Sequence, residues 1–285
     1  MNQFHWNGKP LSVQALDDGL WVSPTTEKVS YPSAHSKLIS TLEEGSFWFQ
    51  HRNKCITCIV NRFPPDGTIW DIGGGNGWVA LGLEHAGYPA YVVEPSLDGA
   101  KTARARGLSP VFCAFLEDLG LPNNSISAAC AFDVLEHIEN PQNTLESVYA
   151  KLKPGGLFYI TVPAFQSLWS QEDVLVGHYL RYNVKSLVSL VTSNHFEVLY
   201  HTYFFKYLVI PAFISRKIYY FIKQNPYKKG HDKVVMSEHL HESRFIQEVL
   251  SFLSRNEHRR LSKGRVDVGT SLLMVCRKPL SEATD

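Results

Sequence analysis

The stretch Trp70-Asp71-Ile72-Gly73-Gly74-Gly75-Asn76-Gly77 decides the fold of this chain. It leads from a short apolar segment into a glycine turn, and a second strand-like segment, Tyr91-Val92-Val93, ends at Glu94. Glycine lets the backbone approach a ligand where a Cβ atom would block it. A carboxylate at the end of the second strand is placed to accept hydrogen bonds from two ribose hydroxyls. Together these features predict a site for a nucleoside cofactor.

The spacing of the glycines separates this turn from two common phosphate-binding turns. A dinucleotide-binding turn has the pattern Gly-x-Gly-x-x-Gly, whereas counting from Gly73 places Trp78 at the position of the third glycine. The chain also lacks the pattern Gly-x-x-x-x-Gly-Lys-Ser/Thr that cradles nucleotide phosphates. A glycine turn alone also occurs without a ligand, but its combination with Glu94 favours a cofactor site.

The composition is that of an ordinary folded protein. The chain has 285 residues, of which 44% are hydrophobic and 19% charged, enough for one large domain or one domain with a cap. Its net charge of +1 provides no overall field that attracts nucleic acid, so we expect no nucleic-acid partner.

The cysteines and the apolar runs bear on the location of the protein. Five cysteines without the spacing of a disulfide framework predict buried thiols in a reducing, cytoplasmic compartment. Cys55 and Cys58 form a Cys-x-x-Cys pair, but no second ligand pair accompanies them, so we interpret them as helix-packing residues rather than a zinc site. We find no basic-then-apolar signal segment at the N-terminus and no uncharged apolar run of about 18 residues, and therefore expect no transmembrane helix.

Strand-length apolar segments alternate with helix-length segments along most of the chain. This alternation predicts an α/β fold with a doubly wound, mostly parallel, seven-stranded sheet. Ligands bind beyond the carboxyl ends of the strands in such a sheet, where the glycine turn, Glu94 and Asp133 all fall. The predicted strands are 68–72, 90–94, 110–113, 126–132, 157–162, 196–203 and 269–276, and the predicted helices are 47–62, 77–86, 96–106, 134–152, 184–193 and 238–254.

The same pattern divides the chain into four parts. We expect an irregular N-terminal cap or lid over residues 1–46 and a Rossmann-like cofactor-binding core over residues 47–203. A helical insertion over 204–268 is expected to cover the substrate, and residues 269–285 supply the last strand of the core and a C-terminal tail.

Four motifs together resemble those of the class I S-adenosylmethionine (SAM) dependent methyltransferases, in the methyltransferase type 11 and ubiquinone-biosynthesis-like branch. They are the glycine turn at 71–77, Asp118–Ser125, Phe132–Ile138 and Leu152–Gly156. The resemblance implies the Rossmann-like fold of that class, with SAM as the cofactor. It places Gly73 and Gly75 under the methionine and ribose of SAM, Glu94 at the ribose hydroxyls, Phe132 and Asp133 beside the sulfonium, and Asp71 and Pro95 within the same site.

The adenine end departs from the family pattern. Members often carry an acidic residue three places before the position of Asp118, and it binds the adenine amino group. Here that position holds Phe115. We therefore expect adenine to be held by stacking and by the backbone, with the N–H of Leu116 as a candidate donor.

Two charged groups near the expected cofactor have two interpretations each. In similar enzymes an arginine at about the spacing of Arg52 pairs with the carboxylate of SAM, a geometry that suits a guanidinium fork. The alternative is that Arg52 is a surface residue of its helix.

Asp133, Glu136 and His137 resemble a motif that binds Mg²⁺ in ubiquinone O-methyltransferases. Because histidine is an unusual ligand for Mg²⁺ and Asp-x-x-Glu suits a capping box, we favour capping and expect no metal.

The polar and aromatic loop 164–182 follows the fifth predicted strand and should face the methyl group. Loops of this length usually carry function. Methyl transfer to a hydroxyl requires removal of a proton, and the imidazole of His178 suits that role. The alternative is that His178, Arg181 and Tyr182 only fasten the loop. The candidate catalytic residues are His178, Asp133, Arg181 and Tyr182, with Trp169 as a candidate substrate contact.

The apolar segment 204–222 has three open interpretations. It forms helices packed on the core or at a homodimer interface, or one wall of an apolar substrate pocket in which Phe205, Tyr207 and Phe213 contact the acceptor. The third interpretation is peripheral contact with a membrane, with its lysines and arginines at the headgroups.

The resemblance implies an enzyme that moves a methyl group from SAM to a small or lipid-like acceptor, and we expect methylation at oxygen. One alternative is a methyltransferase that acts on a lipid- or carrier-linked glycan. A second is a SAM-binding protein that has lost catalysis and serves as a partner subunit.

Overall fold

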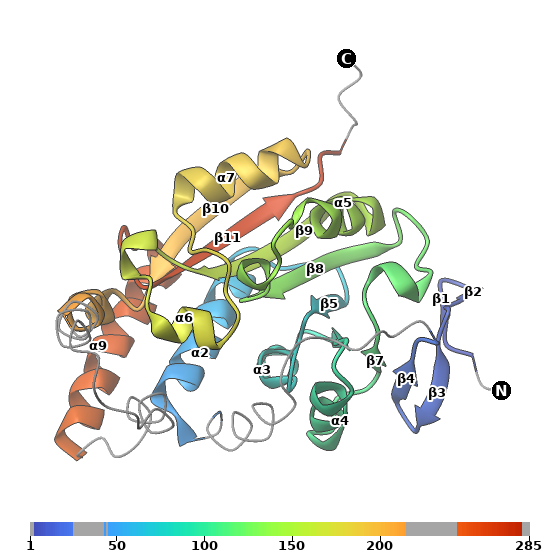
Figure 1. The fold of residues 1–285 in the computed structure, drawn as a ribbon, viewed down its shortest axis with the longest axis horizontal. Helices are drawn as coiled ribbons and strands as arrows, with labels where there is room; N and C mark the ends of the chain where they lie inside the picture. Colours follow the sequence, from blue (N-terminus) through green and yellow to red (C-terminus); the bar gives the residue numbers. More distant parts are fainter. Residues whose placement is uncertain (1–2, 25–42, 44, 215–243, 281–285) are drawn as a thin grey trace, which may run out of the picture.

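A single nine-stranded sheet forms the centre of the computed structural model, which describes residues 3–24, 43, 45–214 and 244–280 (Figure 1). From one edge to the other its strands are β10 (Glu197–Phe204), β11 (Ser271–Arg277), β9 (Leu152–Pro163), β8 (Ile126–Phe132), β5 (Ile69–Ile72), β6 (Ala90–Val93), β7 (Val111–Cys113), β4 (Leu20–Val22) and β3 (Gln14–Asp17). The five strands from β9 to β7 are mutually parallel.

Helices cover both faces of this sheet, which explains why its central strands are apolar throughout. Every residue of β5 is buried, as expected for a parallel strand with helices on both sides. One face packs against α2 (Phe47–Arg62), α3 (Trp78–His85) and α4 (Leu97–Ala105), and the other against α5 (Gln142–Lys151) and α7 (Val184–Ser193). The expected α/β fold is therefore confirmed.

The strand order reverses at β5, and this reversal positions the site. The chain passes from β5 to β6 and β7 on one side of the sheet, and then to β8 and β9 on the other. Ligands bind at such a switch point in doubly wound sheets. At the far edge β11 lies antiparallel between β9 and β10, with Leu273 opposite Thr161 on one neighbour and Thr202 on the other.

The N-terminal segment extends the sheet, so the expectation of an irregular cap is wrong for residues 3–24. Strand β4 pairs in parallel with β7, and β3 pairs with β4. Strands β1 (His5–Trp6) and β2 (Lys9–Pro10) form a separate hairpin. Aromatic packing explains the arrangement, because Phe4 and Trp6 lie edge-on to Phe112 and Trp70 of the core. Residues 25–42 of the expected lid lie outside the described residues.

The predicted helix 134–152 is two elements. A 3₁₀ turn at Leu135–His137 is followed by an irregular link, and α5 begins only at Gln142. Proline cannot continue a preceding helix, because its ring fixes φ and removes the N–H donor. Pro141 therefore serves as the residue before α5, and the residues preceding it are free to turn toward the site.

The insertion between β10 and β11 is helical where it is described. A 3₁₀ turn at Lys206–Leu208 leads into a helical segment at 209–214, and α9 (Arg244–Lys263) packs against α2 (Figure 1). Residues 215–243, and with them part of the predicted segment 204–222, lie outside the described residues. Among the described helices, none is long and apolar enough to cross a membrane.

Candidate functional site

A cavity of about 480 Å³ lies at the carboxyl ends of β5, β6 and β8. Ligand sites commonly measure about 300–1,000 Å³. Of the predicted site residues, Gly73, Gly75, Glu94, Pro95, Phe115, Leu116 and Asp133 line it. The lining also includes Glu43, Asn76, Val134, His137, Ile138 and Thr144. Asn76, Val134 and Ile138 lie within the motifs quoted from the sequence, but only His137 had a candidate role, as part of the disfavoured metal motif.

The glycine turn forms the floor of the cavity through backbone that has no side chain. Gly73 has φ +68°, and a Cβ atom there would lie 2.8 Å from Cγ2 of Val134. Gly75 also has positive φ, and a Cβ atom there would meet no atom within 4 Å. The backbone at Gly75 therefore borders open space in which a ligand can approach it closely.

Glu94 is held rigidly at the end of β6. One carboxylate oxygen accepts a hydrogen bond from the N–H of Gly75 at 2.8 Å, and the other accepts one from the N–H of Ser96 at 2.7 Å. Burial raises the pKa of Glu94 to about 6, although these two bonds act in the opposite direction. A carboxylate has about four lone-pair sites, so two remain for donors in the cavity.

Asp71, which the resemblance placed in the cofactor site, lies beneath the glycine turn and not among the lining residues. Its Oδ1 accepts a bond from the thiol of Cys130 at 3.2 Å, and a Cβ atom on Gly74 would lie 2.9 Å from Oδ2. Burial raises the pKa of Asp71 to about 6. Asp71 therefore supports the turn from below. The sequence could not reveal this, because alternate residues of a strand face opposite sides.

The expected adenine end is an apolar wall. Phe115 lines the cavity and keeps 43% of its surface exposed, so its ring is available to a planar ligand. Leu116 and Glu117 follow it at the start of a 3₁₀ turn, Glu117–Leu119. Phe115 and Leu116, the residues proposed for the adenine end, thus lie side by side at the cavity.

Arg52 is engaged by Asp133. Its Nε donates to Oδ2 of Asp133 at 2.7 Å, its Nη2 lies 2.6 Å from the same oxygen, and Nη2 also donates to the carbonyl of Phe132. The guanidinium is buried and is not a surface group, so the surface alternative is wrong. Neither Arg52 nor Phe132 is among the residues lining the cavity, so the pairing of Arg52 with the carboxylate of SAM is not part of this arrangement.

Asp133 does not cap a helix, and the favoured capping box is therefore wrong. Its φ of +58° is left-handed, whereas an N-cap residue has extended backbone. No side chain caps the 3₁₀ turn that follows. Instead Oδ1 of Asp133 accepts a bond from the hydroxyl of Thr161 at 3.0 Å, and Oδ2 is taken by Arg52. The unusual backbone brings the carboxylate to the cavity wall.

Asp173 organises the loop after β9. It lies in a short helix, α6 (Gln171–Leu175), and is 1% exposed. Its Oδ1 bonds Nδ1 of His178 and Nε of Arg181, each at 2.8 Å, and Oδ2 accepts from Ser170. Burial alone would raise the pKa of Asp173, but His178 and Arg181 outweigh it and hold the pKa at about 2. The carboxylate is therefore ionised and orients His178.

Two histidines meet behind the cavity wall. His137 lines the cavity, and its ring lies edge-on to that of His178 with 4.7 Å between centroids. Burial and the neighbouring His178 lower the pKa of His137 to about 4. Oε1 of Glu136 lies 4.0 Å from Nε2 of His178, and its Oε2 is buried with no hydrogen-bond partner among the described residues. These three side chains form one of two groups in the described chain with donor atoms close enough to hold an ion.

Arg181 and Tyr182 fasten the loop rather than face the cavity. Arg181 bonds Asp173 and the carbonyl of Ala164. Tyr182 is 3% exposed, its hydroxyl donates to the carbonyl of Leu135, and burial raises its pKa. Both side chains contact the loop and its neighbours, as expected if they fasten the loop, and not as expected if they take part in catalysis.

The candidate substrate residues also lie apart from this cavity. Phe205 is fully buried and stacks on Trp48 with 5.3 Å between ring centroids, because the chain turns inward there with φ +59°. Tyr207 packs beside Phe205 and His51, and Phe213 is 43% exposed. Neither these three residues nor Trp169 is among the residues that line the cavity. In the described part of 204–222, Phe204 and Phe205 therefore pack in the core, whereas Ile210, Phe213 and Ile214 are exposed.

Comparisons with known proteins agree with this architecture. A family model described as "Methyltransferase domain" matches residues 48–208. A Mycolicibacterium smegmatis protein named a probable S-adenosylmethionine-dependent methyltransferase is 24% identical over 172 residues, which are 59% of this chain and 66% of that protein. An uncharacterized methyltransferase of Mycobacterium bovis is 27% identical over 130 residues, 41% of this chain and 48% of that protein.

A solved structure shows the same fold. Phosphoethanolamine N-methyltransferase 2 of Haemonchus contortus, in complex with S-adenosyl-L-methionine, aligns with a TM-score of 0.53 and 18% identity, covering 88% of this chain and 58% of that one. The sequence match covers about two thirds of the length of the Mycolicibacterium smegmatis protein and about half of the length of the Mycobacterium bovis protein.

Proposed function

Because this chain belongs to the methyltransferase-domain family, we propose that it transfers a methyl group from SAM to a hydroxyl of a small or lipid-like acceptor. The arrangement of Asp173, His178 and His137 beside the cavity carries this proposal. An ionised carboxylate holds one imidazole, and a second imidazole borders the space in which an acceptor would lie. Such a pair suits the removal of a hydroxyl proton.

The residues of the cavity fit SAM. Gly73 and Gly75 leave the floor free of side chains, and Glu94 keeps lone pairs for the two hydroxyls of a ribose. Phe115 offers an exposed ring to adenine, and the N–H of Leu116 remains the proposed donor. When bound there, SAM supplies an electrophilic methyl group.

The carboxylate of Asp133 would lie beside the positive sulfonium. It is buried to three quarters of its side-chain surface, and its charge is shared with Arg52. Since burial strengthens electrostatic interactions, we propose that this ion pair orients the cofactor end of the site. Arg52 then acts by positioning Asp133, in place of its expected contact with the carboxylate of SAM.

Burial and the neighbouring His178 lower the pKa of His137, so the neutral imidazole is favoured at the cavity wall. A neutral imidazole can accept a hydroxyl proton. Asp173 lies 2.8 Å from His178 and orients that ring beside His137. We therefore propose that the acceptor hydroxyl meets His137 and gives its proton to this pair of histidines.

The cavity wall also bears on the acceptor. Val134 and Ile138 are apolar, and Thr144 adds one hydroxyl. A wall of this kind suits an aromatic or prenyl-bearing acceptor better than a charged one. Methylation of a carrier-linked glycan, peripheral membrane contact and a homodimer stay open predictions.

A turnover assay tests this proposal. The purified protein is incubated with SAM and a panel of hydroxylated aromatic, prenyl-bearing and glycan acceptors, and S-adenosylhomocysteine is quantified. We expect acceptor-dependent product that falls in His178→Ala while SAM binding persists. Binding of SAM without turnover of any acceptor would instead favour a non-catalytic partner subunit. Faster methylation of amines than of the matched alcohols would contradict methylation at oxygen.

A further inference from the structure

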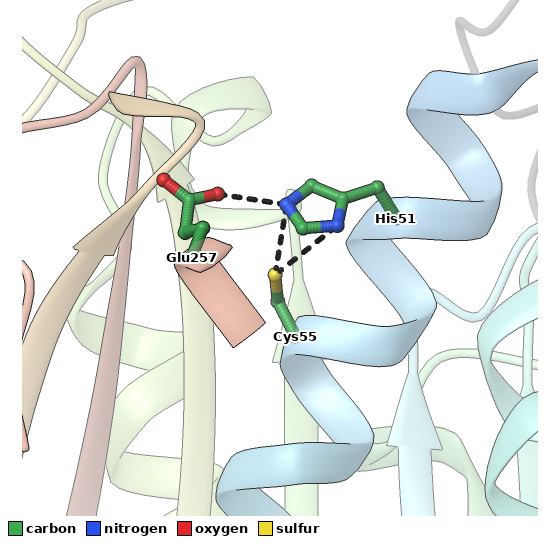
Figure 2. A group of neighbouring side chains, drawn as sticks. All are labelled: His51, Cys55 and Glu257. Carbon is green, nitrogen blue, oxygen red and sulfur yellow. Dashed lines mark hydrogen bonds and ion pairs between the residues drawn. The ribbon is translucent and has the colours of Figure 1, made fainter. Parts of the chain in front are cut away.

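A second group of possible ion ligands lies away from the cavity, between α2 and α9. Figure 2 shows His51 and Cys55 on α2 and Glu257 on α9 turned toward one another. Nε2 of His51 lies 2.7 Å from Oε2 of Glu257 and 3.4 Å from Sγ of Cys55. His51 is 2% exposed, Glu257 is 5% exposed and Cys55 is fully buried. Of the two cysteines in the Cys-x-x-Cys pair, only Cys55 belongs to this group, and Cys58 does not.

Local structure explains how the three donors meet. Residues four apart on a helix share one face, which brings His51 and Cys55 together. Glu257 is fixed because its carboxylate accepts bonds from the backbone N–H groups of Phe205 and Lys206, at 2.9 and 2.7 Å. Carboxylates that bind metals are usually held by such additional hydrogen bonds.

The geometry does not fit a nucleophilic cysteine. In a catalytic triad the nucleophile and the acid contact opposite nitrogens of the imidazole. Here Nε2 is the nearest ring nitrogen to both partners, because Sγ lies 4.0 Å from Nδ1. Burial and the nearby Glu257 also raise the pKa of the Cys55 thiol, which opposes nucleophilic activation. The three donor atoms instead converge on one point.

The donor types and their separations fit a small divalent ion. Thiolate, imidazole and carboxylate are the ligands of zinc, with bonds of about 2.3 Å to sulfur and about 2.0–2.2 Å to nitrogen and oxygen. Tetrahedral angles then separate nitrogen from sulfur by roughly 3.6 Å and from oxygen by roughly 3.4 Å. The observed Sγ–Nε2 separation of 3.4 Å is close to that value. The Nε2–Oε2 separation of 2.7 Å must open when an ion enters.

We infer that His51, Cys55 and Glu257 form a binding site for one transition-metal ion of the zinc class, with water as the fourth ligand. A cavity of about 510 Å³, bordered by His51, gives access to solvent. Lys54, Arg255 and Arg259 also line that cavity, and their positive charge opposes a free cation. The thiolate and the carboxylate must therefore supply the attraction. Binding requires Cys55 as the thiolate and therefore releases the thiol proton.

Metal analysis provides the first test. The protein, expressed without a histidine tag and purified without chelators, should contain about one equivalent of zinc per chain by mass spectrometry of the metal. After removal of the metal, Co²⁺ should restore one equivalent with a sulfur-to-cobalt charge-transfer band. An ion at Glu136, His137 and His178 would give no such band, because that group contains no cysteine.

Matched variants locate the ion. Cys55→Ala should abolish the band and weaken Co²⁺ binding by at least the roughly 10–100-fold that loss of an outer-shell partner costs. Cys58→Ala, which removes a buried thiol from the same helix, should keep both. His51→Gln should weaken binding, and zinc should raise the melting temperature of the wild type and of Cys58→Ala only. Absence of the band in the wild type, or its persistence in folded Cys55→Ala, would overturn the inference and leave a hydrogen-bonded contact without metal.

Discussion

Replacing Glu94 with alanine should weaken SAM binding by roughly 100-fold. The magnitude follows from the hydrogen bonds of the carboxylate. Gly75 and Ser96 occupy two of its lone-pair sites, and two remain for the ribose hydroxyls. A hydrogen bond to a charged group contributes about 1.5–3 kcal/mol, so two at the lower limit contribute about 3 kcal/mol, or roughly 100-fold in affinity.

The affinity should also depend on pH through this residue. Burial raises the pKa of Glu94 to about 6 in the free protein. Only the ionised carboxylate accepts from both ribose hydroxyls, so below about pH 6 binding must first displace a proton. Affinity should therefore fall as pH falls through about 6 and stay level above it. Burial also raises the pKa of Asp71 to about 6, and the charge of Asp71 in turn raises the pKa of Glu94. Asp71 is retained in the Glu94 variants, so a pH dependence that disappears in them belongs to the carboxylate of Glu94.

Isothermal titration calorimetry with SAM, between about pH 5 and about pH 8, measures both effects. Glu94→Gln should bind weakly and lose the pH dependence that belongs to Glu94. Glu146→Ala, at an exposed position on α5, is a control that should bind like the wild type. Circular dichroism verifies that each variant is folded. Wild-type affinity in folded Glu94→Ala, or an unchanged pH profile in Glu94→Gln, would refute the assignment of Glu94 to the ribose.

Three further outcomes follow from the described contacts. His178→Ala should lower turnover by about 10²–10⁴-fold and leave SAM affinity unchanged in calorimetry; an equal loss of SAM binding would support loop fastening. Phe205→Ala should lower the free energy of unfolding by about 3–5 kcal/mol in a denaturant titration, because the ring is fully buried; a raised Michaelis constant for the acceptor at normal stability would contradict this. Mg²⁺ added after chelation should leave turnover unchanged, because Asp133 is ion-paired with Arg52; restoration of lost activity by Mg²⁺ would reverse that expectation.

The parallel core could be predicted because its signals are local. Strands β5, β6 and β8 are largely buried and appear as mostly apolar runs, each followed by a glycine or an acidic residue. The methyltransferase family and the Rossmann-like fold are confirmed, and the name of the Mycolicibacterium smegmatis relative supports SAM as the cofactor. Gly73 and Glu94, which directly follow strands β5 and β6, line the cavity, and their contact with the cofactor stays a prediction.

What could not be predicted depends on contacts between distant segments. No local pattern shows that Arg52 reaches Asp133 across 81 positions of the chain. The left-handed turn at Asp133 is likewise fixed by Arg52 and Thr161, and its sequence suits a cap equally well. The pairing of β4 with β7 depends on aromatic packing between residues far apart in sequence. The burial of Asp173 beside His178 and Arg181 likewise has no local signal in the sequence.

Helix α2 connects the two sites through adjacent residues. His51 contacts Glu257 of α9, and Arg52 contacts Asp133 at the wall of the cavity. The contact of His51 with Glu257 is buried and that of Arg52 with Asp133 is partly buried, so a shift of α2 would disturb both. Glu257 in turn holds the turn at Phe205, where the chain leaves β10 for the insertion. Helix α2 thus contacts both α9 of the insertion and Asp133 at the cavity wall, although the described residues of the insertion do not line the cavity.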